Sequence, residues 1–217
     1  MKRLTALILV CVLALMTSCI SVFAQEQPAH IAELTKYGII KGDPDGNMRL
    51  SDNLTRAEAV TLLVRLYGIS PETSMAAPAN EFPDMKGHWA CNAAMIAKEL
   101  QIIDKNGELF TPDEAIKSEE FLKMIVSLLG YEVLAEQKEG DPIGYLMVAS
   151  QLGVTKGVSL ATGRYITRDD AMKMLLNSFD IPLMVITSYG ENTEYAIMDG
   201  KDGRLYQSLR TMFEKGE

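Results

Sequence analysis

Few residues in this chain could support covalent or acid–base chemistry. Acidic pairs stand at Glu119-Glu120 and Asp169-Asp170, each ahead of an apolar run. Neighbouring acids at the start of a helix suit its dipole but point in different directions, whereas glycoside hydrolysis needs two carboxylates across a cleft. Cys91 is expected to be a small buried side chain, and two histidines supply no set of nucleophile, base and orienting group. We therefore expect a protein that is not an enzyme and needs no cofactor.

Metal-binding chemistry is also poorly supported. The segment Asp43-Pro44-Asp45-Gly46-Asn47 has the oxygen-rich composition of a calcium loop. Counted from Asp43, however, the sixth position is Met48 and the twelfth is Leu54, where such a loop needs glycine and glutamate. His88 is a lone histidine, which disfavours a transition-metal site. We predict a turn at this segment and no bound metal.

One short pattern occurs three times in the chain. Its versions are Leu54-Thr55-Arg56-Ala57-Glu58, Ile116-Lys117-Ser118-Glu119-Glu120 and Ile166-Thr167-Arg168-Asp169-Asp170. Two versions carry arginine, whose guanidinium can hold a carboxylate through two parallel hydrogen bonds. The repetition indicates an architecture built from related units.

Each version is expected to open a helix and to be positioned by a helix–loop–helix unit. Thr55 and Glu58 form a capping box, in which each side chain bonds the backbone amide of the other residue. Apolar residues recur at helical spacing after each version and in a shorter helix before it. The first of these shorter helices should begin after Pro28 and end near Gly38, and the last should begin near Asp141.

The end of the chain has a different composition. Residues 183–187 and 195–198 have the character of strands, and an amphipathic helix is expected at about residues 201–213. This tail resembles the opening of another unit.

Length and composition indicate a globular, exported protein. The 217 residues are 47% hydrophobic with a formal net charge of −8, which argues against binding to nucleic acid. Residues 1–24 have the charged start, apolar run and cleavage site of a signal peptide, and the apolar run is too short to span a membrane. Cys19 follows a stretch similar to a lipobox, so a lipid anchor there is an alternative. Cleavage after Ala24 would leave Cys91 without a second cysteine.

The order of the motifs resembles the S-layer homology (SLH) family. Its repeats run F-x-D-x-x-x-x-W-A, a helix, G-I-I-x-G, a turn with D-G, F-x-P and a T-R-A-E helix. The corresponding residues here are Gly38-Ile39-Ile40-Lys41-Gly42, Asp45-Gly46, Thr55-Arg56-Ala57-Glu58, Phe82-Pro83-Asp84, Trp89-Ala90, Phe110-Thr111-Pro112 and Thr167-Arg168. The resemblance covers about residues 28–182. It divides the chain into repeat 1 (28–70), repeat 2 (81–131) and repeat 3 (141–182), with a tail at 183–217.

The resemblance implies a mainly α fold, in which three helix–loop–helix repeats form a pseudo-threefold spindle with the T-R-A-E helices at its centre and a short α+β tail. It also implies non-covalent binding of a cell-wall polysaccharide, often pyruvylated, in grooves between repeats. The ligand-binding residues that it indicates are Arg56, Asp84, His88, Trp89 and Arg168.

The chain departs from the family pattern in ways that bear on this site. Repeat 2 has Ser118 where the arginine belongs, and repeats 1 and 3 lack the F-x-D and W-A elements. We therefore expect Arg56 to combine with Asp84, His88 and Trp89 in the one complete site, and Arg168 to form a partial site.

Simpler structural roles are alternatives for the same residues. Arg56 could pair with an acid, Trp89 could belong to the core, and Asp84 could cap the helix that follows Trp89. Glu58 is expected to be a helix cap rather than a ligand contact.

Two functions follow from the sequence. The first is a secreted, non-enzymatic module that anchors itself, and possible further surface-protein domains, to the cell wall through polysaccharide. The alternative is a secreted module for protein–protein interaction or assembly that has lost glycan binding.

Overall fold

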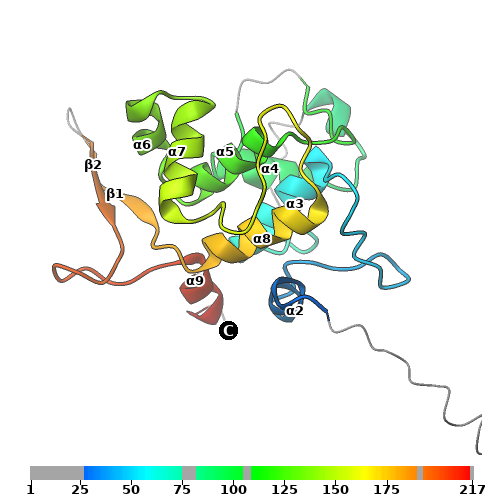
Figure 1. Cartoon of the computed structure of the whole chain (residues 1–217), viewed down its shortest axis with the longest axis horizontal. Coiled ribbons are helices and arrows are strands. Elements are labelled where there is room, and N and C mark those ends of the chain that lie inside the picture. The colour runs from blue at the N-terminus through cyan, green and yellow to red at the C-terminus, as the bar shows by residue number, and fades with distance from the viewer. Residues whose placement is uncertain (1–26, 75–81, 105–108, 190–192, 216–217) are drawn as a thin grey trace, which may run out of the picture.

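The computed structural model describes residues 27–74, 82–104, 109–189 and 193–215 (Figure 1). The predicted signal peptide, with Cys19, lies outside the described residues, as does part of the segment that links repeats 1 and 2. Within the described residues, the chain is mainly helical with one small two-stranded sheet in the tail, which confirms the predicted fold class. No helix among them is long and apolar enough to cross a membrane.

Three central helices form the core of the molecule and pack against one another in pairs. They are α3 (Arg56–Leu66), α5 (Ser118–Leu128) and α8 (Arg168–Phe179). Each is the helix that follows one version of the repeated pattern. The predicted pseudo-threefold arrangement of these helices is thus confirmed.

The first helix of each repeat packs on the central helix of a different repeat. These outer helices are α2 (Ala29–Lys36), which packs on α8; α4 (Cys91–Glu99), which packs on α3; and α7 (Ile143–Leu152), which packs on α5. These three pairings run in a cycle around the molecule. Every repeat therefore depends on another repeat to bury its apolar faces.

A ring of backbone hydrogen bonds joins the three repeats ahead of the central helices. The Leu54 amide donates to the Ile166 carbonyl at 2.9 Å, the Ile116 amide to Leu54 at 2.9 Å, and the Ile166 amide to Ile116 at 3.1 Å. All three side chains are buried. Two residues further on, the amides of Arg56, Ser118 and Arg168 each donate at 2.9 Å to a carbonyl of the adjoining repeat. The ring satisfies backbone groups that would otherwise be buried without a partner.

The predicted helix caps are present. The Thr55 hydroxyl accepts from the Glu58 amide at 3.2 Å, and the Glu58 carboxylate accepts from the Thr55 amide at 3.1 Å, which completes the capping box. Thr167 caps α8 in the same way by accepting from the Asp170 amide. The caps fix where each central helix begins, and therefore which residue points into the adjoining repeat.

The structure adds one helix that the sequence analysis did not assign. Helix α6 (Glu132–Lys138) packs against α7, and a Cβ on Gly144 would overlap the Ala135 carbonyl oxygen. The buried face of α7 carries Tyr145, Val148 and Ala149, which face α5 and α6, while Leu146 and Leu152 are only partly buried.

The tail contains a β-hairpin and a short helix. Strands β1 (Met184–Ser188) and β2 (Glu194–Ile197) are antiparallel, with Ile186 opposite Tyr195. The prediction of a helix from about residue 201 is wrong for its first part. Asp199 and Tyr206 form a bridge across a turn, and α9 (Leu209–Lys215) begins only after Ser208.

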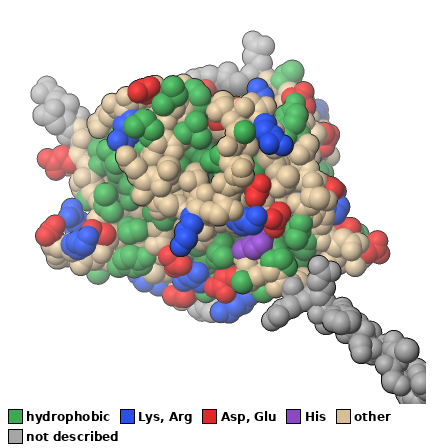
Figure 2. All heavy atoms as spheres, viewed as in Figure 1, with side chains coloured by type: hydrophobic (Ala, Val, Ile, Leu, Met, Phe, Trp, Pro, Cys, Tyr) green, Lys and Arg blue, Asp and Glu red, His purple; other side chains and the backbone are tan. Residues whose placement is uncertain are grey.

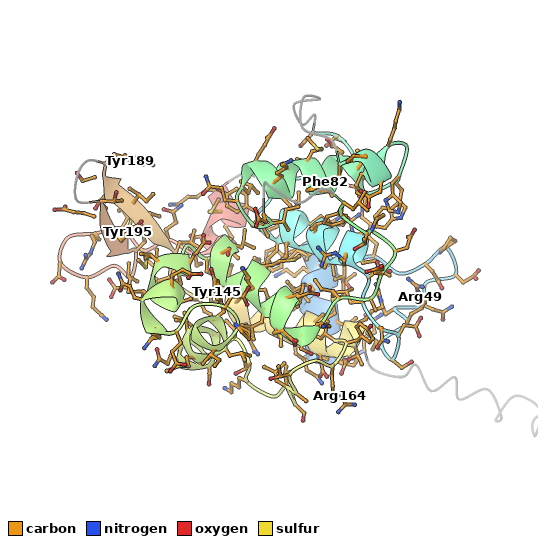
Figure 3. All side chains as sticks on the ribbon, turned by 90° about the horizontal axis from the view of Figure 1, so that it is seen from above. Arg49, Phe82, Tyr145, Arg164, Tyr189 and Tyr195 are labelled. Atoms are coloured by element: carbon orange, nitrogen blue, oxygen red, sulfur yellow. The ribbon has the colours of Figure 1, made fainter. Side chains whose placement is uncertain are left out.

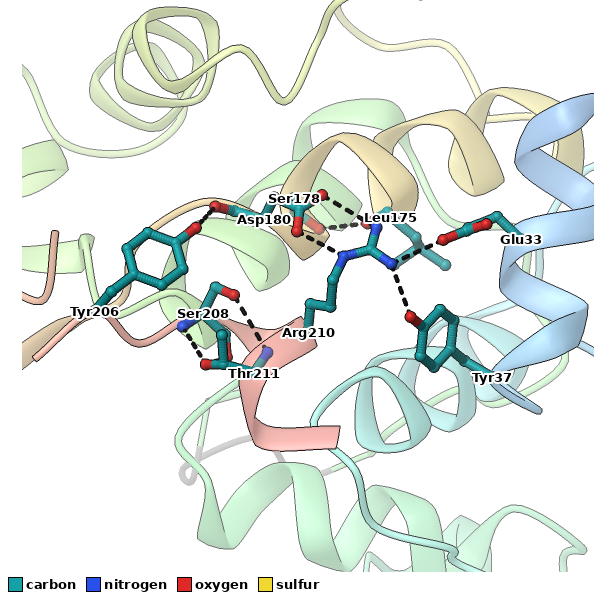
Figure 4. Close-up of polar contacts among 9 residues, drawn as sticks. All are labelled: Glu33, Tyr37, Leu175, Ser178, Asp180, Tyr206, Ser208, Arg210 and Thr211. Atoms are coloured by element: carbon teal, nitrogen blue, oxygen red, sulfur yellow. Dashed lines mark hydrogen bonds and ion pairs between the residues drawn. The ribbon is translucent and has the colours of Figure 1, made fainter. Parts of the chain in front are cut away.

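Arg210 ties the tail to repeats 1 and 3 (Figure 4). Its guanidinium binds the Asp180 carboxylate at 2.6 and 3.0 Å, Glu33 at 2.7 Å and the Tyr37 hydroxyl at 2.9 Å. It also lies 4.5 Å from the centre of the Phe179 ring. Hydrogen bonds, mainly to Asp180, raise the pKa of Arg210 further above its already high range, so it stays charged.

We predict that Arg210→Ala lowers the free energy of unfolding by about 2 kcal/mol, because it leaves Glu33 and Asp180 without their cation and removes packing on two rings. Urea denaturation followed by circular dichroism measures the change. Arg204→Ala, which removes an exposed pair with Asp202, is the matched control and should change stability by less than about 0.5 kcal/mol. Equal effects for the two variants would contradict the assigned role of Arg210.

Candidate functional site

A groove that we call the Trp89 groove brings together side chains from all three repeats. It encloses about 200 Å³. Its lining residues are Lys41, Gly42, Asp43, Arg49, Glu58, Thr61, Leu62, Arg65, Trp89 and Arg168. Trp89 precedes α4, which packs on α3, while Arg168 is the first residue of α8.

Trp89 presents its indole to solvent. Its exposed fraction is 64%, so the alternative in which it belongs to the core is wrong. An exposed indole at the rim of a groove offers a flat apolar face for a ligand. The His88 ring lies 5.5 Å from the indole, measured between ring centres, and its Nδ1 accepts from the Ala90 amide at 3.2 Å.

Arg168 has two of its guanidinium nitrogens engaged inside the protein. Nε donates to the Met48 carbonyl at 2.9 Å, and Nη1 lies 2.9 Å from the Glu58 carboxylate. The third nitrogen, Nη2, has no hydrogen-bond partner in the part of the chain that the structure describes. Only 8% of the side chain is exposed. The guanidinium is therefore held in place by Met48 and Glu58 where Arg168 lines the groove.

Glu58 does more than cap its helix. Besides the Thr55 amide and Arg168, its carboxylate binds the Arg49 guanidinium at 2.8 Å. Two arginines therefore share one acid at the groove. Figure 3 shows Arg49 on the loop at the edge of the molecule.

Cationic side chains outnumber acids among the residues that line the groove, although the protein as a whole is acidic. Four cationic side chains line it, against two acids. The Glu72 carboxylate contacts Arg65 and lies 3.4 Å from Lys41. Burial would raise the pKa of Glu72, but hydrogen bonds from Arg65, from its own backbone amide and from Ser70, together with the charge of Arg65, outweigh that effect and lower the pKa to about 2. Figure 2 shows both signs of charge intermixed over the lower half of one face.

Arg56 occupies the equivalent position between repeats 1 and 2. Its Nε donates to the Phe110 carbonyl at 2.8 Å, and Nη1 lies 3.6 Å from the Glu120 carboxylate. Arg56 does not line the Trp89 groove. The predicted combination of Arg56 with Trp89 is therefore corrected: Trp89 shares its groove with Arg168. The cause is that each outer helix packs on the central helix of another repeat, so that α4, with Trp89 just before it, lies against α3.

Asp84 organises a turn of repeat 2. Its carboxylate accepts from the Phe110 amide at 3.0 Å and from the Thr111 amide at 2.6 Å, where Thr111 has a φ of 52°. The suggested role of Asp84 as a cap for the helix after Trp89 is therefore wrong. Burial tends to raise the pKa of Asp84, but the two amides and the nearby charge of Arg56 outweigh it, and the pKa is lowered.

The third equivalent position lacks a guanidinium and leaves a hollow. The Ser118 hydroxyl donates to the Arg164 carbonyl at 3.1 Å, beside a cavity of about 180 Å³ that we call the Ser118 pocket. Leu160 and Asp170 line it. By the repeat register, Leu160 corresponds to Met48 and Phe110, and Asp170 to Glu58 and Glu120. The partners of an arginine are thus present without the arginine.

The described residues offer no metal centre. No group of three or more His, Cys, Asp or Glu side chains among them could hold a metal ion. The Asp43 carboxylate accepts from the Asp45 and Asn47 amides at 3.0 and 2.8 Å, which is the predicted turn. Cys91 is only partly buried, less so than predicted.

Fold and groove together define a class: a helical three-repeat module with a groove that cationic side chains and an exposed indole line. Comparison with family models gives the same answer, because the model of the S-layer homology domain matches residues 26–60 and 81–122. Residues 26–60 and 81–122 of this chain are thus similar to the S-layer homology domain. Repeat 3 lies outside the matched residues, but α8 takes its place in the same threefold core.

Several curated proteins are similar to this chain. The middle cell wall protein of Brevibacillus brevis is 28% identical over 77% of this chain and 16% of its own length. The cell surface protein of Thermoanaerobacter kivui is 28% identical over 71% of this chain and 20% of its own. An amylopullulanase of Thermoanaerobacterium thermosulfurigenes is 32% identical over 50% of this chain but only 6% of its own. The chain thus spans about a fifth or less of these relatives.

We predict that Asp84→Asn lowers the free energy of unfolding at neutral pH by about 1 kcal/mol, because an amide accepts the two backbone hydrogen bonds less strongly than a carboxylate. The folded-state pKa is lowered, so the stabilisation is present above the ordinary carboxyl pKa of about 3.9 and is lost as pH falls through the folded value.

Urea denaturation at neutral and acidic pH tests this prediction. The difference between Asp84→Asn and wild type should shrink at acidic pH. Asp113→Asn, which alters a carboxylate that is 86% exposed, is the control and should change little. An equal loss at both pH values would contradict the proposed role of the Asp84 charge.

We also predict that Ser118→Arg raises the free energy of unfolding by about 1 kcal/mol, because the new guanidinium can donate to the Leu160 carbonyl and pair with Asp170. Thermal and urea denaturation measure it. Adding Asp170→Asn should remove most of the gain in a double-mutant cycle. A destabilised Ser118→Arg would show that the Ser118 pocket is not the counterpart of the two arginine positions.

Proposed function

We propose that this chain is a non-enzymatic module that attaches to the cell wall by binding an acidic, pyruvylated polysaccharide in the Trp89 groove. The match of residues 26–60 and 81–122 to the S-layer homology domain supports a role at the cell surface. The relatives that carry the match are a middle cell wall protein and a cell surface protein. The match to the amylopullulanase covers so little of that enzyme that it lends no catalytic role to this chain.

The observation that carries the proposal is the meeting of Arg168 and Trp89 in one groove. A ketal carboxylate can accept from the free Nη2 of Arg168 and from the exposed Arg49, while the sugar ring packs on the indole. Each charged hydrogen bond contributes about 1.5–3 kcal/mol. The rigid hold on Arg168 by Met48 and Glu58 keeps the donor in place before the ligand arrives, which lowers the entropic cost of binding.

A single groove of this kind should bind modestly. Arg56 offers a second guanidinium between repeats 1 and 2, where no tryptophan accompanies it. A polymer that carries many carboxylates can contact both positions, and the second contact gains from effective concentration. The net charge of −8 opposes an anionic ligand only over the screening length of about 8 Å at physiological salt.

The site residues divide by role under this proposal. Trp89, Arg168 and Arg49 contact ligand, while His88 orients the indole and Asp84 shapes the neighbouring turn. Arg56 forms the secondary contact. Binding of this kind places the chain outside the cell, as the predicted signal peptide requires. A lipid anchor at Cys19 is the alternative form of attachment.

A module for protein assembly that has lost glycan binding is the second candidate. Two observations favour it: Ser118 replaces one arginine, and both remaining arginines make ion pairs within the protein. The two functions differ in what a change at Trp89 does to wall binding.

We predict that Trp89→Ala reduces retention on purified wall polysaccharide about tenfold, which corresponds to about 1.4 kcal/mol, without altering stability. The indole is exposed, so the fold does not depend on it. Tyr165→Ala is the matched control: this ring is 54% exposed and lines the Ser118 pocket rather than the Trp89 groove.

Cosedimentation with the polymer, before and after chemical removal of its pyruvate, measures the effect. Wild-type retention should fall when pyruvate is removed. Full retention of Trp89→Ala on the untreated polymer would favour the assembly module, and equal retention on both polymers would exclude the carboxylate contact.

A further inference from the structure

A second hollow lies between the β-hairpin of the tail and the ends of the repeat helices. We call it the hairpin groove. It encloses about 710 Å³, more than three times the Trp89 groove. The side chains that line it are Tyr67, Leu100, Gln101, Ser127, Glu132, Val133, Glu136, Met184, Val185, Ile186, Tyr189 and Tyr195, beside Gly130. Its size is that of a typical small-ligand site.

Three tyrosine rings stand along the hairpin groove. Tyr67 is the C-cap of α3, while Tyr189 and Tyr195 belong to the hairpin, where Figure 3 labels them. Tyr189 is 83% exposed and Tyr195 41% exposed. Tyr195 stands opposite Ile186 in the strand register, so the ring and the aliphatic side chain share one face of the hairpin. Exposed rings that line a cavity offer stacking surfaces to a ligand.

The polar part of the hairpin groove accepts hydrogen bonds and carries no positive charge. Gln101, Ser127, Glu132 and Glu136 supply amide, hydroxyl and carboxylate groups, and no lysine or arginine is among the lining residues. The Tyr145 hydroxyl donates to both glutamates, at 3.3 and 2.9 Å, and so holds them in place. Two acids without a cation repel an anion, whereas acceptors between aromatic faces suit a ligand rich in hydroxyl donors.

The hairpin groove continues into a second hollow of about 350 Å³. The two share Gln101, Ser127 and Glu132, and the second extends to Lys123 and Asp104. Polar side chains thus continue along α5 beyond the hairpin groove, and the Lys123 ammonium there pairs with the Asp141 carboxylate at 2.7 Å. This shape favours a chain of units over a single small molecule.

The hairpin is fastened to repeat 2, so the hairpin groove is formed before any ligand binds. The Met184 amide donates to the Leu129 carbonyl at 3.0 Å, and the Tyr131 hydroxyl donates to the Pro182 carbonyl at 2.8 Å. A Cβ on Gly130 would overlap the Met184 carbonyl oxygen. Glycine is therefore required where β1 meets the end of α5, and Arg210 holds the other end of the tail.

We propose that the hairpin groove binds a neutral oligosaccharide, with Tyr195 and Tyr189 stacking on sugar rings and Gln101, Glu132 and Glu136 accepting from hydroxyls. This site needs neither arginine nor a carboxylate on the ligand. It is separate from the Trp89 groove in residues and in chemistry, and it is independent of the function proposed above.

The test is titration of the full chain with soluble neutral tetrasaccharides built from N-acetylglucosamine, glucose, xylose or mannose, with tetragalacturonate as the anionic comparison. Isothermal titration calorimetry and tyrosine ring shifts in nuclear magnetic resonance report binding. At least one neutral tetrasaccharide should bind and shift the ring signals of Tyr195, and tetragalacturonate should not. Failure of every neutral tetrasaccharide to bind would overturn the proposal.

Variants locate the site. Tyr195→Ala should weaken binding about tenfold, or about 1.4 kcal/mol, while Tyr165→Ala, an exposed ring outside the hairpin groove, should leave it unchanged. Trp89→Ala should also leave binding of the neutral tetrasaccharide unchanged. A failed prediction at the hairpin groove can therefore be told apart from a failed prediction at the Trp89 groove. If Tyr195→Ala binds saccharide with wild-type affinity, the proposal is overturned. It is also overturned if analytical ultracentrifugation shows a dimer that Tyr195→Ala dissociates and that no saccharide dissociates, because the hairpin groove would then be an interface between copies.

Discussion

The structure depends on the ring of backbone hydrogen bonds between Leu54, Ile116 and Ile166. It joins three chain segments far apart in sequence at the axis of the molecule, immediately before the helices that fill the core. Each aliphatic side chain is buried there, so an opened ring would leave amides and carbonyls without partners in an apolar centre. Because each central helix begins two residues after a ring residue, its first residue always faces the adjoining repeat. The geometry at Arg56, Ser118 and Arg168 is thus set by the backbone.

This placement gives the arginine of the pattern two tasks at once. Arg168 ties repeat 3 to repeat 1 through the Met48 carbonyl and Glu58, and it also lines the Trp89 groove. A guanidinium has five donors in a fixed fork, so it can hold an internal acid and still offer an edge outward. Lysine could not do both. Glu58 also has more than one role, since its single carboxylate caps α3 and holds both Arg49 and Arg168.

Local sequence signals predicted most helices and strands correctly, but they did not predict which of these elements pack against one another. Thr55 with Glu58 predicted a helix start, and the structure confirms it, because capping acts within four residues. The grouping of Trp89 with Arg168 was missed, since it follows from α4 packing on a helix of another repeat, and no local pattern encodes that choice. Helix α6 was missed for a related reason: Ala135 is its one buried residue, so little periodicity marks it. The hairpin strands were predicted, but Gly130, which brings them against repeat 2, gave no signal beyond ending a helix.

The same architecture explains how one of three related positions could lose its arginine. The ring is made by backbone groups, and the amide of Ser118 bonds the adjoining repeat at 2.9 Å, as the amides of Arg56 and Arg168 do. The side chain at this position can therefore change without disrupting the threefold packing. The Ser118 pocket is the space that the smaller side chain does not fill. Trp89 has no counterpart in repeats 1 and 3 for the same reason, since the indole lies outside the core. Divergence between grooves costs the fold little, so each groove of a repeat protein of this kind is free to acquire its own chemistry.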